Sequence, residues 1–66
     1  MKLLIRFDST YSDRRVWMVD VLWHGTSDDR SKAYIFTKCL ADENITEWLA
    51  ADVPGWTICA ETVEEQ

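Results

Sequence analysis

The stretch of residues 39–56, CLADENITEWLAADVPGW, carries the one convincing helical pattern in the chain and so constrains how the other segments pack. Pro54 disfavours the helical conformation at the residue ahead of it, so we expect the helix to end before Val53. A side chain that accepts a backbone hydrogen bond should open the helix, and both Thr37 and Asp42 qualify as this N-cap. Within the helix, the apolar stripe of about 100° consists of Ala41, Ile45, Trp48 and Leu49.

Alternating apolar and polar side chains predict four strands around this helix. Their expected bounds are Lys2–Phe7, Arg14–His24, Lys32–Lys38 and Trp56–Val63. The order β-β-β-α-β predicts an α+β fold, with a single four-stranded, mainly antiparallel sheet and one helix on one face. A helical crossover should return the last strand beside the first and parallel to it. Residues 1–66 are expected to form one small domain, with residues 64–66 as a frayed acidic tail.

One helix covers only one face of such a sheet, so the opposite face should be apolar and bare. The residues expected there are Leu4, Val16, Met18 and Leu22, with either Tyr34 and Phe36 or the side chains opposite them. An exposed apolar area of this kind usually marks a contact surface. The alternative is that long basic side chains shield the face with their apolar stems. The four tryptophans leave a similar choice between core filling and an exposed anchor for a partner.

Charge is divided unevenly along the chain. Residues 1–38 hold all seven basic side chains and five of the twelve acidic ones, so their net charge is +2. Residues 39–66 hold the other seven acidic side chains and no Lys or Arg, so their net charge is −7 and that of the whole chain is −5. This balance argues against direct binding of nucleic acid, which requires clustered cations. An acidic surface could instead meet a basic surface of a partner protein, or simply keep the protein soluble.

No pattern of catalytic or metal-binding residues is present. His24 has no nucleophile assigned to it by spacing, and with Cys39 and Cys59 it does not make a zinc-ligand pattern. Phosphate-binding glycine motifs are absent, and the core of so short a chain leaves little room for a substrate pocket. We therefore expect no enzyme activity, no cofactor and no metal. The two cysteines are too few for a disulfide scaffold, and the N-terminal MKLLIRF is not a signal peptide, so we expect a cytoplasmic protein.

The C-terminal half resembles the small T7-type phage inhibitor of bacterial RNA polymerase. The resemblance covers the run that begins at Phe36, with the pairs Glu47-Trp48 and Val53-Pro54 before Gly55 and Trp56, and it extends to the segment Arg14-Arg15-Val16-Trp17. It implies a phage protein that binds a host enzyme. That family uses basic residues of its last strand, whereas residues 57–63 here contain Glu61 and no base.

These observations lead to a functional hypothesis. The chain is interpreted as an acidic protein-binding module, encoded by a phage, that occludes the basic nucleic-acid-binding surface of a host enzyme such as RNA polymerase or a nuclease. The partner-binding residues are predicted to be Asp42, Glu43, Glu47, Asp52, Glu61, Met18 and Trp23, with the tail acids Glu64 and Glu65 beside them. The alternative is a structural homodimer, formed through the open sheet face, with no enzyme target.

Overall fold

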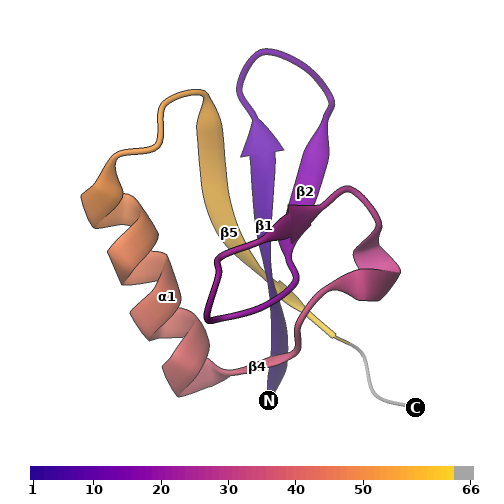
Figure 1. Ribbon diagram of the computed structural model, residues 1–66, viewed down its shortest axis with the longest axis vertical. Coiled ribbons are helices and arrows are strands. Elements are labelled where there is room, and N and C mark those ends of the chain that lie inside the picture. Colours follow the sequence, from indigo (N-terminus) through magenta and orange to yellow (C-terminus); the bar gives the residue numbers. More distant parts are fainter. Residues whose placement is uncertain (64–66) are drawn as a thin grey trace.

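The computed structural model describes residues 1–63 and has the predicted α+β architecture, with one α-helix packed on one antiparallel sheet (Figure 1). The expected tail at residues 64–66 lies outside the described residues. In chain order the elements are β1 (Lys2–Ser9), β2 (Arg15–Met18), β3 (Thr26–Ser27), the short 3-10 helix η1 (Arg30–Lys32), β4 (Phe36–Thr37), α1 (Lys38–Ala51) and β5 (Trp56–Thr62).

Strand β1 is the centre of the sheet. β5 pairs with one edge of β1 over seven residue pairs, and β2 and β4 share the other edge, with β3 outside β2. The last strand therefore lies beside the first, as expected, but the prediction of a parallel pair was wrong. The chain makes one more reversal than predicted, at β3 and η1, so β4 runs antiparallel to β1. Helix α1 then runs in the same direction as β1, and β5 runs antiparallel to β1 (Figure 1).

Two of the predicted strands are much shorter in the structure. β2 ends at Met18 because the next residues form a loop, in which the carboxylate of Asp20 accepts a hydrogen bond from the backbone N–H of Trp23. Of the predicted strand at residues 32–38, only Phe36 and Thr37 pair with β1. Just before them, the N–H of Tyr34 donates to the carbonyl of Met18 at 2.9 Å, so the segment that precedes β4 is hydrogen-bonded to the end of β2.

The core lies between α1 and the face of the sheet that β1 presents to it. Phe36, Ile5 and Met18 are its largest fully buried side chains. Leu3 and Phe7 share the inward face of β1 with Ile5, as the alternation predicted. The remaining members of the buried cluster are Val16 and Ala41, and the apolar side chains packed partly against it are Val21, Leu40, Ile45, Trp48, Trp56 and Ile58.

Helix α1 begins and ends where local chemistry requires. Thr37 is the N-cap, its hydroxyl accepting from the N–H of Leu40 at 3.3 Å, which decides between the two candidates. The predicted apolar stripe is only partly correct, because Leu49 is 64% exposed while Asn44 is buried. Asn44 is satisfied there by donating its side-chain N–H to the carbonyl of Leu40 at 2.9 Å. A polar residue with an in-helix partner thus takes a position that hydrophobicity alone would not assign to it.

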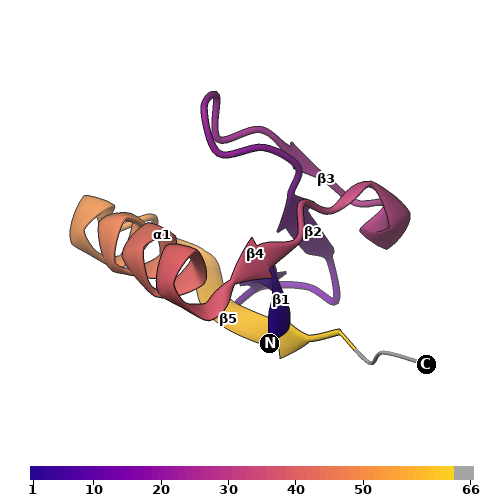
Figure 2. The ribbon, with the colours of Figure 1, turned by 90° about the horizontal axis from the view of Figure 1, so that it is seen from below.

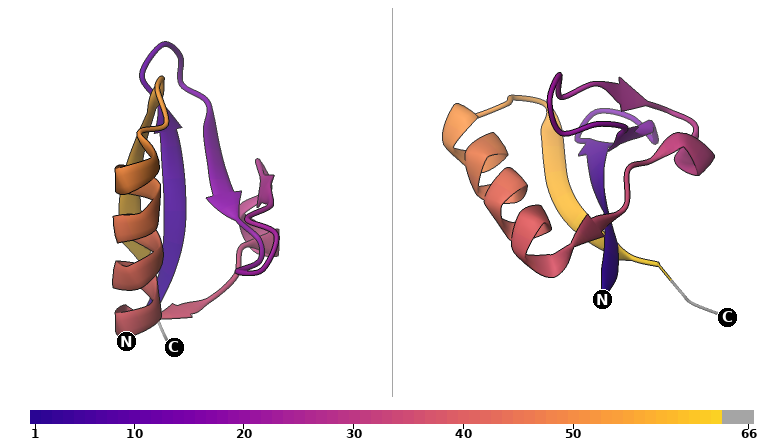
Figure 3. Two further views of the ribbon diagram at one scale, coloured as in Figure 1. Left: turned by 60° about the vertical axis from the view of Figure 1, so that its left-hand side comes forward. Right: turned by 60° about the horizontal axis from the view of Figure 1, so that its bottom comes forward.

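The face of the sheet opposite α1 is not bare, contrary to the sequence-based expectation. Val16 pairs with Phe7, and this register turns Val16 and Met18 toward the helix and Trp17 away from it. Leu4 is also buried. Figures 2 and 3 show α1 and η1 on opposite sides of β1, so the segment around η1 lies over part of the second face. Large apolar side chains are instead exposed mainly outside the sheet, at Met1, Tyr11, Leu22, Trp23, Tyr34, Ile35 and Leu49.

Candidate partner-binding surface

The outward face of α1 is acidic and exposed. Asp42, Glu43 and Glu47 all lie on the side of the helix opposite the buried Ala41 and Asn44. Lys38 pairs with Asp42 at 2.9 Å, one turn away, and it is the only cation in the helix. Among residues 1–63, Glu43 and Glu47 form no salt bridge, so the helix presents net negative charge to solvent.

Asp52 adds a further carboxylate at the end of the helix. It is the C-cap residue, in the left-handed conformation with φ of 53°, and its N–H donates to the carbonyl of Leu49 at 3.3 Å. The side chain is exposed. Asp52 therefore places a further exposed carboxylate at the C-terminal end of α1.

The loop that connects β2 to β3 places two large apolar side chains in solvent next to α1. Leu22 is 79% exposed and Trp23 is 82% exposed. A hydrogen bond from the N–H of Val19 to the carbonyl of Gly25, 2.9 Å long, closes the loop at its base. His24, in the left-handed region at φ 55°, packs its ring against Trp48 of α1 with ring centroids 5.5 Å apart. This contact places His24 of the loop against the side of α1 that packs on the sheet, while Leu22 and Trp23 remain in solvent.

Met18 does not belong to this surface, and its predicted role as an exposed anchor was wrong. The side chain is fully buried between sheet and helix. Its sulfur lies 3.3 Å from the indole nitrogen of Trp48, which donates to it. The alternation of β2 could not show this, because both faces of that strand are apolar in the sequence and only the pairing of Val16 with Phe7 selects the buried one.

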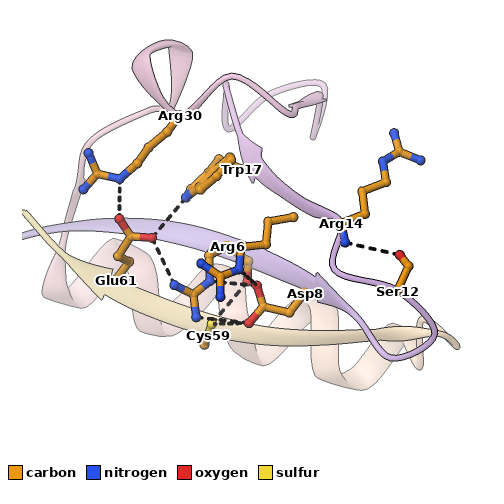
Figure 4. Close-up of polar contacts among 9 residues, drawn as sticks. Arg6, Asp8, Ser12, Arg14, Trp17, Arg30, Cys59 and Glu61 are labelled. Carbon is orange, nitrogen blue, oxygen red and sulfur yellow. Dashed lines mark hydrogen bonds and ion pairs between the residues drawn. The ribbon is translucent and has the colours of Figure 1, made fainter.

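Glu61 also lies apart from the acidic helix face. It projects from β5 on the opposite face of the sheet, where its carboxylate accepts hydrogen bonds from Arg6 and Trp17, each at 3.2 Å, and from Arg30 (Figure 4). Burial raises the pKa of Glu61, but the bonds from Arg30, Trp17 and Arg6 together lower it by more, so the net direction is downward. The charge of Glu61 is thus engaged within the molecule, and we remove this residue from the predicted partner-binding set.

The same polar cluster extends to β1. Arg6 donates a hydrogen bond to Asp8 at 3.0 Å, and this bond raises the pKa of Arg6. The Nε atom of Arg6 and the Oδ1 atom of Asp8 also lie 2.8 Å apart, but they are not aligned for a hydrogen bond. The thiol of Cys59 lies 3.8 Å from Asp8 (Figure 4). Cys59 is half-buried, Cys39 is exposed, and both are free thiols. The arrangement is that of a structural ion-pair network that ties three strands together.

Asp29 stabilises the segment that carries Arg30 into this cluster. It is the N-cap of η1, and its carboxylate accepts from both the hydroxyl and the N–H of Ser31, at 2.7 and 3.0 Å. These bonds lower the pKa of Asp29. Asp29, the second residue of the pair Asp28-Asp29, therefore has a structural role as the N-cap of η1.

Two hollows lie at the end of the sheet where β1 turns into β2. The larger, of about 450 Å³, is open and polar, and the smaller, of about 170 Å³, lies between the sheet and the end of α1. The smaller one is lined by Phe7, Arg14, Val16, Thr26, Trp48, Val53 and Trp56. The guanidinium of Arg14 lies 5.9 Å from the centre of the Trp56 ring, a cation–π contact at the rim.

Among residues 1–63 there is no group of three or more His, Cys, Asp or Glu side chains placed to hold a metal ion. Within the same residues, no helix has both the length and the apolar character needed to cross a membrane. Comparisons of the chain with protein-family models, with curated proteins and with solved structures give no match.

The sequence analysis expected Leu22 to be exposed on the bare face of the sheet, but it did not place Leu22 beside Trp23 in a loop. It assigned both to a long strand, because residues 14–24 are rich in strand-forming side chains. A signal was available in Asp20 and Gly25, which bracket the pair, since aspartate often forms a turn with the backbone that follows it. The structure uses Asp20 in this way.

Proposed function

We propose that this protein is a small, non-enzymatic binding module that acts in the cytoplasm and inhibits a nucleic-acid-processing enzyme by covering its basic, nucleic-acid-binding surface. The observation that carries the proposal is the exposed acidic surface of α1, formed by Asp42, Glu43, Glu47 and Asp52, together with the exposed Trp23 of the loop between β2 and β3. A surface that binds nucleic acid is rich in Lys and Arg. An acidic helix face is complementary to such a surface and competes with the nucleic acid for it.

The two parts of the surface have different roles in this mechanism. The carboxylates of α1 steer association and make it sensitive to salt. Trp23, with Leu22 beside it, supplies the apolar anchor, because a large aromatic side chain buried on binding typically carries much of the affinity of an interface. The contact of His24 with Trp48 keeps the anchor and the helix in a fixed relation, which lowers the conformational cost of binding.

The resemblance of the C-terminal half to the T7-type phage inhibitor of bacterial RNA polymerase supports a phage origin and a host enzyme as the target. That family grips an acidic polymerase surface with basic residues of its last strand. The corresponding strand here, β5, contains no Lys or Arg. We therefore propose that this protein binds a basic surface, either of RNA polymerase or of another enzyme that acts on nucleic acid.

The alternative of a homodimer through the open sheet face has lost its support. That face was expected to be apolar and bare, but Arg6, Asp8, Glu61 and Arg30 form an ion-pair network there and Trp17 is buried against it.

The test is capture of host proteins by the immobilised chain from a bacterial lysate, at ~50 mM and at ~500 mM salt. We expect enzymes with basic nucleic-acid-binding surfaces to be retained at low salt and released by added double-stranded DNA. The variant with Glu43→Lys and Glu47→Lys should lose most of this capture, and Trp23→Ala should weaken it without changing its salt dependence.

The matched control is the variant with Asp13→Lys and Asp28→Lys, which makes the same change in net charge at exposed positions away from α1. It should retain the partner. Equal capture by the helix variant and the wild type at low salt would contradict the assignment of this surface, and failure of DNA to compete would contradict occlusion as the mechanism.

A further inference from the structure

Strand β5 has one edge paired and the other edge open. Its seven residues pair with β1 from Leu3 to Ser9, and no other strand of the described chain pairs with β5. Helix α1 packs against the face of the sheet, and the views in Figures 2 and 3 place β5 at the border of the sheet. An open strand edge is a template for pairing with another strand.

The direction of the free backbone groups follows from two hydrogen bonds at the ends of the β1–β5 pair. The N–H of Thr10 bonds to the carbonyl of Gly55 at 2.9 Å, and the N–H of Val63 bonds to the carbonyl of Lys2 at 3.0 Å. In an antiparallel pair, backbone groups alternate between the two edges. The odd-numbered residues of β5 therefore bond to β1, and the even-numbered residues direct their N–H and C=O groups to the open edge. These residues are Trp56, Ile58, Ala60 and Thr62.

The open edge lacks the features with which proteins usually protect such strands. β5 contains no proline and no lysine, and its one charged residue is Glu61. That charge is already engaged with Arg6 and Arg30 on the far face of the sheet. Edge strands are commonly blocked by charged side chains, by proline or by a bulge. β5 is thus a neutral edge with regular pairing along its whole length.

We infer that two copies of this chain associate through antiparallel pairing of β5 with β5, about a two-fold axis at Cys59. In this register Trp56 lies opposite Thr62 of the second copy and Ile58 lies opposite Ala60, so all four outward residues are paired. A symmetric pairing centred on Ile58 would place Thr62 opposite Pro54, which has no N–H to donate. The register centred on Cys59 also sets Glu61 opposite Thr57, so the two acidic side chains do not meet.

The inference does not depend on the proposed function, because it uses a different surface. It also has the opposite salt dependence. Each copy carries a net charge of −5, so added salt should strengthen the pairing of two copies, whereas it weakens attraction of the acidic helix to a basic partner. Seven residues of one strand form a small interface, so the association should be weak and visible at high protein concentration.

Hydrogen exchange at single amides, followed by NMR from ~10 μM to ~1 mM protein, tests the pairing directly. The amides of Ile58 and Ala60 should exchange freely at low concentration and become protected at high concentration. Those of Thr57 and Cys59 bond to β1 and should be protected throughout. Sedimentation over the same range should show a monomer–dimer equilibrium that high salt favours. Monomer at every concentration, or even-numbered amides that never gain protection, would overturn the inference.

Two variants add a site-specific check. Ala60→Pro removes an outward N–H while leaving the bonds of β5 to β1 in place, and it should weaken dimerisation at least ~tenfold, with unchanged circular dichroism as the control for folding. In the Cys39→Ser variant, diamide should oxidise the two Cys59 thiols to a disulfide across the axis, itself taking up the two hydrogens. Facing residues of this kind lie within disulfide reach. Cys59→Ser, which retains the more exposed Cys39, should cross-link more slowly. Faster cross-linking through Cys39 would contradict the register. If the wild-type protein paired only with strands of other proteins, the partner of β5 would not be a second copy of this chain, and the inference would be wrong.

Discussion

At the scale of single residues, the most consequential side chain is Glu61. The sequence shows it as one more acid in a strongly acidic half, but it joins three elements by accepting from Arg6 of β1, Trp17 of β2 and Arg30 of η1. Because the carboxylate is partly screened from water, loss of it would remove an acceptor that Arg6, Trp17 and Arg30 share. Its role is therefore to hold the second face of the sheet together.

The first prediction concerns this carboxylate. Glu61→Ala should lower the free energy of unfolding by about 2 kcal/mol, because two guanidinium groups and an indole N–H lose a shared acceptor. Urea unfolding followed by circular dichroism measures the change. Glu47→Ala, at an exposed position of α1, is the control and should change stability by less than about 0.5 kcal/mol. Equal effects of the two substitutions would show that the network contributes nothing specific.

The pH dependence of the same group has a defined sign. The folded protein holds the pKa of Glu61 below its ordinary value of 4.5, so its contribution to stability is present above that pH and is lost as the pH falls through the lower folded value. The difference in unfolding free energy between the wild type and Glu61→Gln should therefore be constant near neutrality and shrink below about pH 4.5. A difference that grows as acid is added would contradict the assignment.

At the scale of elements, α1 is defined by its ends. Thr37 satisfies a backbone N–H at the start, and Asp52 closes the helix in the left-handed conformation. Asp52 is a costly choice, because a carboxylate at the C-terminal end faces the negative end of the helix dipole. A residue that lowers stability in this way at an exposed position is consistent with the proposed role of Asp52 in partner binding.

The second prediction follows from this position. Asp52→Asn should raise the free energy of unfolding by about 0.5–1 kcal/mol, because asparagine tolerates the left-handed conformation and removes the unfavourable charge. Thermal unfolding at low salt measures it. Asp42→Asn is the matched control near the start of the helix, where the same change removes the pair with Lys38 and should lower stability. The same direction of change in both variants would contradict the electrostatic explanation.

At the scale of the whole molecule, stability rests on a small core. It is built from the inward face of β1, the buried half of β2, Phe36 and one side of α1, while Leu22 and Trp23 remain in solvent. A domain of this size has a stability of roughly 3–10 kcal/mol, so one large core side chain is a considerable fraction of the total. Selection for folding alone explains the buried set but not an exposed Leu-Trp pair.

The third prediction separates these two groups. Phe36→Ala should cost about 3–5 kcal/mol and leave a substantial part of the chain unfolded at room temperature. Leu22→Ala, at a position that is mostly exposed, should change stability by less than about 0.5 kcal/mol. Near-ultraviolet circular dichroism and urea unfolding report both. A large loss in Leu22→Ala would show that the loop is part of the folding core.

The sequence by itself determined the features that depend on neighbours along the chain. The end of α1 before Val53 follows from Pro54, and the inward face of β1 follows from the alternation of Leu3, Ile5 and Phe7. For the N-cap, the sequence narrowed the choice to Thr37 and Asp42. The α+β class follows from one helical period among several strand periods. Each of these is set by backbone geometry and by contacts within a few residues.

Tertiary structure alone decided which face of β2 is buried, how β5 runs and where the charge of Glu61 goes. Both faces of β2 are apolar, so the register of Val16 against Phe7 selects the inner one. The direction of β5 depends on a reversal at β3 and η1 that is too short to have a periodic signal. Glu61 meets Arg30 across 31 residues of sequence. Pairings between distant segments are chosen by the summed burial and hydrogen bonding of the whole chain, and no local pattern encodes that sum.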